Sequence, residues 1–573
     1  MPKKPEKNKR NILITSALPY VNNVPHLGNI IGCVLSADVW SRYCRSRNYN
    51  SIYICGTDEY GTATETKAKS EGLKEREICD KYNKIHQSVY KWFNIDFDYF
   101  GRTSTPNPKE DSNWNQTKIA QDIFIRLMEN NLLIEKSIDQ LFCLELNTFL
   151  ADRYVYGVCP NCGYDKANGD QCDNCGKLLD PLELINPICK IDPTYKIEIR
   201  TTDHLYLDLP KLQDRLKIWF KNNNNNWTKT ALGITKSWLN LELEPRCITR
   251  DLKWGTPVPN TKQYGDKYKN KVFYVWFDAP IGYISITSNY TDEWKKWWIK
   301  NDEYKVEHVE FMAKDNVPFH SIIFPATLMG TNEKYNLVDK IEAIEYLNYE
   351  NKKFSKSRGV GVFGDSVKNT NIPSDVWRYY LLSIRPEGGD AYFHWDDFAE
   401  KNNNELVNNL GNLTNRILTF TYRKFKKVPP FYKTEYEDKE FVENVNKLTQ
   451  EYIELMENIR LRDGIKQIML LSKIGNKYFQ DRQPWSNLKK NPEICSSVIH
   501  ICVHFLNHLA SLIKPFLPNY TNYISDILSS NCDKINSEIK FEEIKSEVKK
   551  PDIIFEKISE DEIIKYKDFF MSI

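Results

Sequence analysis

Short apolar runs separated by stretches of helical length dominate the chain up to about residue 350. Residues 11–16 and 51–55 are β-type runs with room for one helix between them, which is the pattern of a β-α-β unit. Similar runs return far downstream, at residues 272–277, 308–313 and 342–347. We therefore predict a parallel sheet whose strands come from two distant parts of the chain, with an insertion between them.

A helical periodicity replaces this pattern after residue 400. Apolar residues there recur at spacings of four and three, as on one face of a helix: Leu406, Leu410, Leu413, Ile417 and Phe420. Comparable stripes within 441–480 and 498–513 predict a helical bundle. Residues 529–573 are charged and only partly patterned, and we expect them to return to the body of the molecule.

The composition is that of a multidomain globular protein. Its 573 residues, at a usual size of about 100–200 residues per domain, predict about three to five domains. The net charge is only +2, so any surface that binds a polyanion must be a local patch. No apolar run reaches the ~18 residues of a membrane span, and the run behind the basic residues 1–10 is too short for a signal peptide. We expect a cytoplasmic protein.

Four of the 14 cysteines form two Cys-x2-Cys pairs: Cys159, Cys162, Cys172 and Cys175. A glycine follows each pair, and two such turns bring four thiolates to tetrahedral spacing for one zinc ion. Four thiolates leave no coordination position for water, so the predicted zinc site is structural. Four unligated thiols are the alternative. The other cysteines lie in apolar segments, as expected of a reducing compartment.

The stretch Pro25-His26-Leu27-Gly28-Asn29 follows the first predicted strand and opens the next helix. Backbone N–H groups and the positive end of the helix dipole favour an anion there, and His26 and Asn29 add side-chain donors. Gly28 would let a flat base approach the backbone. A histidine that only caps the helix is the alternative.

A second polar stretch, Lys353-Phe354-Ser355-Lys356-Ser357-Arg358-Gly359, follows the last predicted strand. Its two lysines, with a hydroxyl between them, can stabilise the charge that develops on a departing pyrophosphate. A solvated run of charges is the alternative. Both stretches on one split sheet are more specific than either stretch alone.

Together they resemble the HIGH-type and KMSKS-type motifs of class I aminoacyl-tRNA synthetases, and the methionyl-tRNA synthetase family in particular, in its eukaryotic cytosolic and archaeal branch. The resemblance extends through residues 16–22, 276–283 and 408–412. Two positions depart from the generic motifs. Asn29 replaces a second histidine, which keeps a hydrogen-bond donor but loses a possible positive charge, and Phe354 replaces methionine.

The resemblance implies an α/β fold with a doubly wound, Rossmann-type catalytic domain, split by a zinc-binding insertion and followed by a C-terminal α-helical bundle. It implies the following organisation: a basic tail (1–10), the first catalytic half (11–130), the insertion (131–255), the second catalytic half (256–345), the KMSKS-type loop with a tRNA-stem contact region (346–400), the anticodon-binding bundle (401–528) and a C-terminal segment (529–573).

The implied activity is that of a ligase that uses ATP with Mg²⁺ to activate L-methionine as methionyl-adenylate and then transfers it to the 3′ end of tRNA(Met). His26, Asn29, Lys353 and Lys356 would be catalytic. The implied ATP site adds Gly28, Asp315, Leu347 and Ser355. Asp315 would bind a ribose hydroxyl, with a loop-capping role as the alternative.

The implied methionine site pairs Asp58 with the ammonium group; an N-cap role for Asp58 is the alternative. Tyr283 and His320 could donate hydrogen bonds to the sulfur. The predicted side-chain pocket comprises Leu18, Tyr20, Trp276, Ala279, Pro280, Tyr283, Phe319 and His320. In the bundle, the resemblance assigns reading of the anticodon CAU to Asn412, Arg416 and Trp485. Asn412 and Arg416 share one helical face, and Trp485 could stack on an unstacked base.

Three other functions fit parts of the pattern. A ligase for leucine, isoleucine or valine would carry an editing domain, for which residues 131–255 offer too little chain. A small-molecule adenylyltransferase would not need the C-terminal bundle. A non-catalytic RNA-binding protein would not need His26, Asp58 and Lys356 together.

Overall fold

The computed structural model describes residues 2–150, 154–169, 172, 174–175, 179–350, 361–542, 544 and 547–571. Its centre is a five-stranded sheet in the order β14-β13-β1-β2-β3, in which every pair is parallel. These strands are β1 (Asn11–Ser16), β2 (Asn50–Thr57), β3 (Tyr99–Arg102), β13 (Val306–Ala313) and β14 (Lys340–Ile344). Since β1 pairs with β2 on one side and β13 on the other, the predicted split parallel sheet is confirmed.

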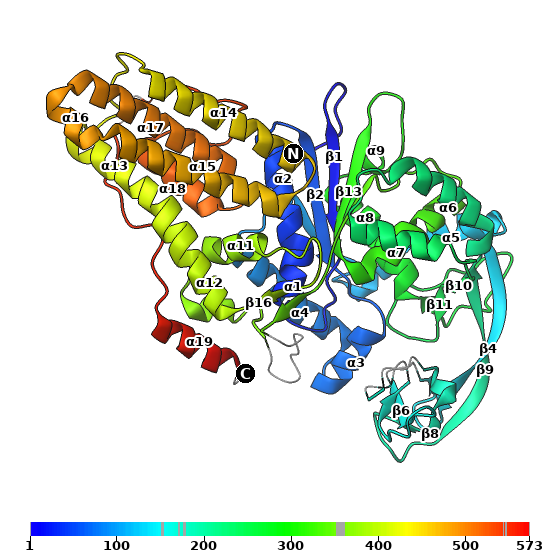
Figure 1. Ribbon diagram of the computed structural model, residues 1–573. Coiled ribbons are helices and arrows are strands. Elements are labelled where there is room, and N and C mark those ends of the chain that lie inside the picture. Colours follow the sequence, from blue (N-terminus) through cyan, green and yellow to red (C-terminus); the bar gives the residue numbers. More distant parts are fainter. Residues whose placement is uncertain are drawn as a thin grey trace.

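Helices cover both faces of the sheet (Figure 1). Along β1, Ile12 and Ile14 pack into one core, whereas Leu13 packs into a second core on the opposite face. The first face carries α1 (Leu27–Asn29), the π-helical segment Ile30–Leu35, α2 (Ser36–Ser46), α4 (Glu75–Trp92) and α11 (Ser374–Ser383). The second carries α5 (Asn115–Glu129), α8 (Val275–Tyr290) and α10 (Phe324–Gly330). Strands buried on both faces are near-continuously apolar, which explains the consecutive apolar residues 12–14 at the centre of β1.

The strand predicted at residues 272–277 is wrong beyond its first two positions. Only Val272–Phe273 form a strand, β12, which pairs antiparallel with β11 (Thr249–Arg250) outside the central sheet. The rest belongs to α8, which is buried on nearly all sides. A helix that is apolar all round has no 3.6-residue periodicity, so its aromatic start was mistaken for a strand.

The insertion is a small lobe carried on a long ribbon. The ribbon consists of β4 (Leu133–Cys143) and β9 (Ile197–Leu207), antiparallel along their whole length. At its far end, β6 (Val155–Val158), β7 (Ala167–Asn168) and β8 (Ile185–Cys189) form a three-stranded sheet (Figure 1). The apolar core of this lobe is small and itself includes Cys159 and Cys172, so the lobe depends on a cross-link for stability.

The C-terminal bundle confirms the predicted helical stripes. It contains the π-helical segment Asn402–Gly411, α13 (Asn412–Lys424), α14 (Tyr436–Glu457), α15 (Leu461–Arg482), α16 (Pro484–Lys490), α17 (Pro492–Ile513) and α18 (Pro518–Leu528). Among the helices that the structure describes, α17 is long and apolar enough to cross a membrane, but 89% of its most apolar window is buried inside the bundle. Its composition is explained by this position in the core.

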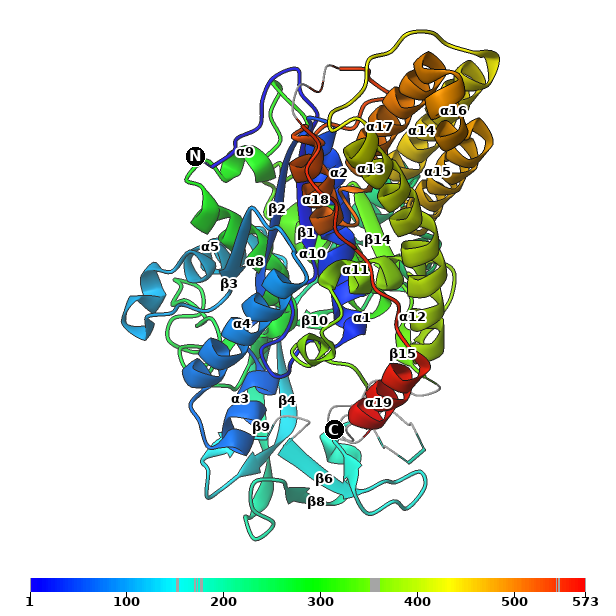
Figure 2. The same cartoon turned by 90° about the vertical axis from the view of Figure 1, so that its left-hand side faces the viewer.

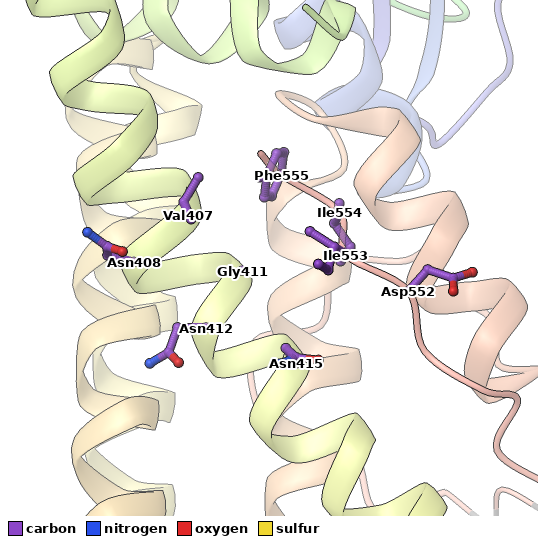
Figure 3. Close-up of a pocket in the computed structure, with 9 residues that line it drawn as sticks. All are labelled: Val407, Asn408, Gly411, Asn412, Asn415, Asp552, Ile553, Ile554 and Phe555. Carbon is purple, nitrogen blue, oxygen red and sulfur yellow. The ribbon is translucent and has the colours of Figure 1, made fainter. Parts of the chain in front are cut away.

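The chain after α18 runs back over the molecule. The Ile535 N–H donates to the Ser46 carbonyl oxygen (3.0 Å), and the Val548 N–H donates to that of Lys426 (2.8 Å). Figure 3 shows Asp552–Phe555 beside the helix that contains Gly411, with Asn412 pointing away from this segment. The segment then descends to α19 (Glu560–Met571), which packs on α12 (Trp395–Lys401) (Figure 2). This segment therefore connects the bundle to the catalytic body.

Candidate functional site

A pocket opens where the strands β1, β2 and β13 end. The carboxyl edge of a parallel sheet is where ligands bind in doubly wound folds. The pocket is lined by Ala17, Leu18, Tyr20, Asp58, Val275, Trp276, Ala279, Pro280, Tyr283, Asn316, Phe319 and His320. All of the residues predicted for the methionine site are in this set. We call it the Asp58 pocket.

The carboxylate of Asp58 is buried and only partly satisfied. The residue is 3% exposed, and within the described part of the chain its Oδ1 atom has no hydrogen-bond partner. Burial, Asp278 and Glu59 raise the pKa of Asp58 well above its ordinary value. The next helix, α3 (Thr62–Glu71), begins after Gly61, so Asp58 is not its N-cap. An uncompensated carboxylate of this kind is suited to a cationic ligand.

Glu59 holds the backbone on which Asp58 sits. Its carboxylate accepts hydrogen bonds from Thr57 Oγ1 (2.8 Å), Arg102 Nε (2.7 Å) and Arg76 NH2 (3.0 Å), and also from the Ser104 hydroxyl. These partners come from β2, β3, α4 and the chain just after β3. Sequence analysis missed this network, because none of its long-range pairs leaves a local signal.

The far wall of the Asp58 pocket contains a hydrogen-bonded Tyr283–His320 pair. His320 Nδ1 lies 2.8 Å from the Asn316 carbonyl oxygen, which can only accept, so Nδ1 carries the proton. Burial lowers the pKa of His320 to about 4, so the ring is neutral and Nε2 accepts from the Tyr283 hydroxyl at 2.8 Å. Both protons are committed. Donation to a thioether would require one of these bonds to break, and it stays a prediction.

Trp276 lies within an aromatic stack at the pocket entrance. Its ring is stacked on Tyr274 (centroids 5.1 Å apart, 26° between planes) and meets Phe319 edge-on (4.9 Å). The Arg250 guanidinium lies 3.6 Å from the Tyr274 ring centroid. Sequence analysis missed Arg250 and Tyr274, which reach the pocket only through this stack. Trp276 is 39% exposed, and its contacts with Tyr274 and Phe319 hold this partly exposed ring in one orientation.

His26 caps the first helix, which is the role named above as the alternative to phosphate binding. Its Nδ1 accepts from the backbone N–H groups of Gly28 (3.0 Å) and Asn29 (3.4 Å), and its own N–H donates to Asn29 Oδ1 (3.3 Å). Because Nδ1 accepts, the proton lies on Nε2. Burial lowers the pKa of His26 to about 4, so at neutral pH this residue offers a hydrogen bond and no positive charge.

A glycine is needed at position 28 because the His26 imidazole lies against its backbone. A Cβ atom at this position would lie 2.9 Å from His26 Cε1 and 3.5 Å from the Leu347 carbonyl oxygen. The imidazole therefore lies directly against the Gly28 backbone, and the approach of a base to this glycine stays a prediction. Leu347, also predicted for the ATP site, begins β15 (Leu347–Tyr349) and is a direct neighbour of the first helix.

The predicted residues Lys353, Ser355 and Lys356 lie outside the described residues, but the segments on either side of 351–360 both contact the His26 stretch. Leu347 precedes residues 351–360 and adjoins Gly28. After it, the Leu27 N–H donates to the Val362 carbonyl oxygen (3.4 Å), and the Gly364 N–H donates to that of Pro25 (2.8 Å). The structure thus brings the flanks of the second motif to the first.

Asp315 follows β13 and is exposed. It accepts a hydrogen bond from the Tyr346 hydroxyl. The adjacent Lys314 pairs with Glu345 (2.6 Å) and Asp390 (3.2 Å). Asp315 therefore lies beside the chain that leads into β15, and its role toward a ribose stays a prediction.

The cysteine set fits a zinc ion. The four sulfur atoms of Cys159, Cys162, Cys172 and Cys175 lie within 4.8 Å of one another, with separations of 3.8 Å for Cys159–Cys175 and 3.6 Å for Cys162–Cys172. A tetrahedral Zn–S distance of about 2.3 Å requires sulfur separations of about 3.8 Å. The Asn161 and Asn174 side-chain amides each lie 3.6 Å from a cysteine sulfur, as partners that stabilise thiolates.

The predicted RNA-reading residues meet on one face of the bundle. Arg416 donates to Gln480 Oε1 (2.6 Å), and its guanidinium lies 5.9 Å from the Trp485 ring centroid. Asn412 donates to Asn476 Oδ1 (3.2 Å), and Trp485 is 42% exposed. Sequence analysis missed Asn476 and Gln480, which lie four residues apart on α15. We call these five residues the Arg416 face.

Comparison with known proteins places the chain in a family. Residues 12–418 match the family model for class I tRNA synthetases (M), and residues 428–573 match the anticodon binding domain of methionyl tRNA ligase. The chain is 50% identical to a probable cytoplasmic methionine–tRNA ligase of Dictyostelium discoideum, over 100% of this chain and 77% of that protein. It is 49% identical to the cytoplasmic enzyme of Saccharomyces cerevisiae, over 98% and 74% of the two chains.

The cytoplasmic methionine–tRNA ligase of Xenopus laevis is 52% identical over 91% of this chain, which spans 57% of that relative. The fold is similar to that of Mycobacterium tuberculosis methionyl-tRNA synthetase in complex with methionyl-adenylate, with a TM-score of 0.77, 19% identity and coverage of 95% and 99%. The match over residues 12–418 covers the central parallel sheet, and the match over residues 428–573 covers most of the helical bundle. The chain therefore belongs to the class I methionine–tRNA ligases.

Proposed function

We propose that this chain activates L-methionine with ATP as methionyl-adenylate and transfers the methionine to the 3′ end of tRNA(Met). The observation that carries the proposal is the Asp58 carboxylate, which is buried and lacks a partner at Oδ1 among the described residues, in an aromatic pocket at the sheet edge. An α-amino acid supplies the missing cation. The thioether then lies against Trp276, Phe319 and Tyr283, where each sulfur–aromatic contact contributes about 0.3–1.5 kcal/mol.

In the first step, a carboxylate oxygen of methionine attacks the α-phosphorus of ATP. The bond from that phosphorus to the bridging oxygen breaks, and pyrophosphate leaves with the electron pair. His26 Nε2–H, the Asn29 amide and the N-terminus of the first helix would stabilise the triphosphate charge as preorganised donors. Lys353 and Lys356, with Ser355, would bind the departing pyrophosphate. Mg²⁺ on the phosphates would neutralise part of the same charge.

In the second step, a hydroxyl of the terminal adenosine attacks the activated carbonyl carbon, and AMP leaves. This step needs mainly orientation of two bound groups, and we assign it no general base. Gly28 and Leu347 would border the adenosine, and Asp315 would bind a ribose hydroxyl.

The remaining assignments concern RNA, metal and compartment. Asn412 and Arg416 would contact base edges of the anticodon CAU, and Trp485 would stack on one of its bases, a contact that contributes about 1–3 kcal/mol. The four-cysteine site would hold one structural Zn²⁺ that cross-links the lobe. The names of the relatives support a cytoplasmic location.

Amino-acid-dependent exchange of labelled pyrophosphate into ATP tests the proposal. We expect methionine to support exchange at least about 100-fold better than leucine, isoleucine or valine, because a difference in side-chain fit of about 3 kcal/mol corresponds to that ratio. Exchange with another amino acid would contradict the substrate. Exchange without subsequent transfer to tRNA would indicate an adenylyltransferase instead.

A further inference from the structure

A group of exposed cations lies at the end of α13 and in the loop that follows it: Arg423, Lys424, Lys426, Lys427 and Lys433. Within the described part of the chain, none of them forms an ion pair. Lys426 lies over the Tyr422 ring (4.0 Å), and Lys427 faces Glu547 across a backbone bridge. The family matches end at residue 418 and resume at 428, so most of this group lies between them. We call residues 423–436 the basic–aromatic loop.

The basic–aromatic loop continues the Arg416 face. At about 100° per residue, Asn412, Arg416 and Arg423 project from α13 within about 40° of one another, and Arg423 lies about 10 Å beyond Arg416 along the helix axis. Aromatic rings connect the two surfaces underneath. Centroid separations are 5.9 Å for Trp485–Phe479, 6.3 Å for Phe479–Phe420 and 6.3 Å for Phe420–Phe425. The two surfaces are therefore one continuous strip.

The loop is held in place while its rings stay exposed. Ser497 Oγ accepts from the N–H groups of Tyr432 (3.0 Å) and Lys433 (3.2 Å), and the Ser496 hydroxyl donates to the Pro430 carbonyl oxygen (2.6 Å). Phe431, Tyr432 and Tyr436 are nevertheless 46%, 56% and 75% exposed. The nearest acids in sequence, Glu435 and Glu437, are paired with Arg482. Glu547 faces Lys427, whereas Arg423 and Lys424 have no acidic partner among the described residues, so that end of the loop keeps its positive charge.

We propose that the basic–aromatic loop binds phosphates of the tRNA next to the anticodon bases, with Arg423 and Lys424 as the main contacts. This inference rests on the proposed function and adds a surface to it. Unpaired cations next to exposed aromatic rings suit single-stranded RNA, whose phosphates and unstacked bases they can both contact. An acidic protein surface would complement the cations. It would not explain the exposed aromatic rings or the position of the loop next to the Arg416 face.

The salt dependence of tRNA binding tests this directly. The variant Arg423→Gln/Lys424→Gln is compared with the wild type and with Lys447→Gln/Lys466→Gln, which removes two exposed cations elsewhere on the bundle. Each phosphate contact contributes about 0.7–0.9 to the slope of log affinity against log salt, so the test variant should lose about 1.4–1.8 of slope. We expect its affinity to fall about tenfold at 0.1 M salt, with pyrophosphate exchange unchanged.

The control variant should keep the wild-type slope. An unchanged slope in the test variant would overturn the inference and point to an acidic protein as the partner of the loop. An equal loss in both double variants would also overturn it, because net charge alone would then explain the effect. If the wild type fails to charge tRNA(Met) at all, it is the proposed function that fails.

Discussion

Asp58 in its pocket and Arg416 on the bundle are both ionisable residues at predicted binding sites, but their surroundings in the free protein differ. Asp58 is buried, and its Oδ1 atom has no partner among the described residues, whereas Arg416 is partly exposed and already bonded to Gln480. A small cationic ligand could therefore supply the partner that Asp58 Oδ1 lacks among the described residues. RNA bound at the Arg416 face, as proposed, would have to exchange with bonds that this face already makes. Binding of methionine and of tRNA should thus respond differently to loss of one side chain.

The largest expected effect is that of Asp58→Asn on methionine activation. The amide keeps the shape but removes the counter-charge of a buried pair, a loss of about 3–5 kcal/mol. We expect kcat/KM for methionine in pyrophosphate exchange to fall at least about 100-fold. Asp292→Asn, an exposed carboxylate elsewhere in the catalytic half, serves as the control. A fall of less than about tenfold would remove Asp58 from the site.

The next effect separates the two roles of His26. Asparagine can also cap a helix, so His26→Asn should keep the stability of the protein within about 0.5 kcal/mol, whereas His26→Ala should lose about 0.5–2 kcal/mol. Both variants lack the Nε2–H donor, and removal of such a donor typically lowers the rate about 10²–10³-fold. Thermal unfolding and single-turnover adenylate formation measure the two effects. Normal adenylate formation by His26→Asn would leave His26 with a capping role only.

Trp485→Ala tests the other side of the comparison. Loss of a stacked base costs about 1–3 kcal/mol, so tRNA affinity should fall about 5- to 150-fold. Because Trp485 lies on the bundle, methionine-dependent pyrophosphate exchange should not change. Filter binding of tRNA(Met) gives the affinity. Loss of exchange together with tRNA binding would instead indicate that the substitution disturbs the fold.

The smallest effect is on stability and its pH dependence. The pKa of Asp58 is raised from its ordinary value of 3.8, so the folded protein holds a proton there that the unfolded chain releases. Stability from this group is therefore present at low pH and is lost as pH rises from about 4 through the raised pKa. Asp58→Asn should match the wild type near pH 4 and exceed its free energy of unfolding by about 1–3 kcal/mol near pH 8. Denaturant unfolding across this range checks the sign, and a variant that is less stable at pH 8 would show that Asp58 is compensated.

Local sequence patterns correctly predicted the features that depend on residues close together in the chain. The strand Asn11–Ser16 is visible from its apolar centre, Ile12–Ile14, which is buried on both faces, and the cysteine set is visible from its spacing alone. The start of α8 was mispredicted because a fully buried helix carries no periodicity. Glu59 was missed for a different reason, since its partners Arg76 and Arg102 are distant in sequence.

The site residues also divide into those that the sequence predicted and those that only the packing of distant segments reveals. The resemblance to the family predicted the residues that line the Asp58 pocket as a set, yet only coordinates show that the Tyr283 hydroxyl donates to His320 and that His320 donates to the Asn316 carbonyl oxygen. Asn412 and Arg416 were found from one helical face, whereas their partners on α15 required the packing of two helices.

The central claim, that Asp58 binds the ammonium group of methionine, is tested most directly by calorimetric titration with methionine and two analogues. Methioninol lacks the carboxylate but keeps the ammonium group, and 4-(methylthio)butanoate lacks the ammonium group. We predict that methioninol binds within about tenfold of methionine and that the deamino analogue binds at least about 100-fold more weakly, with this difference lost in Asp58→Asn. Equal affinity of the wild type for methionine and the deamino analogue would contradict the account.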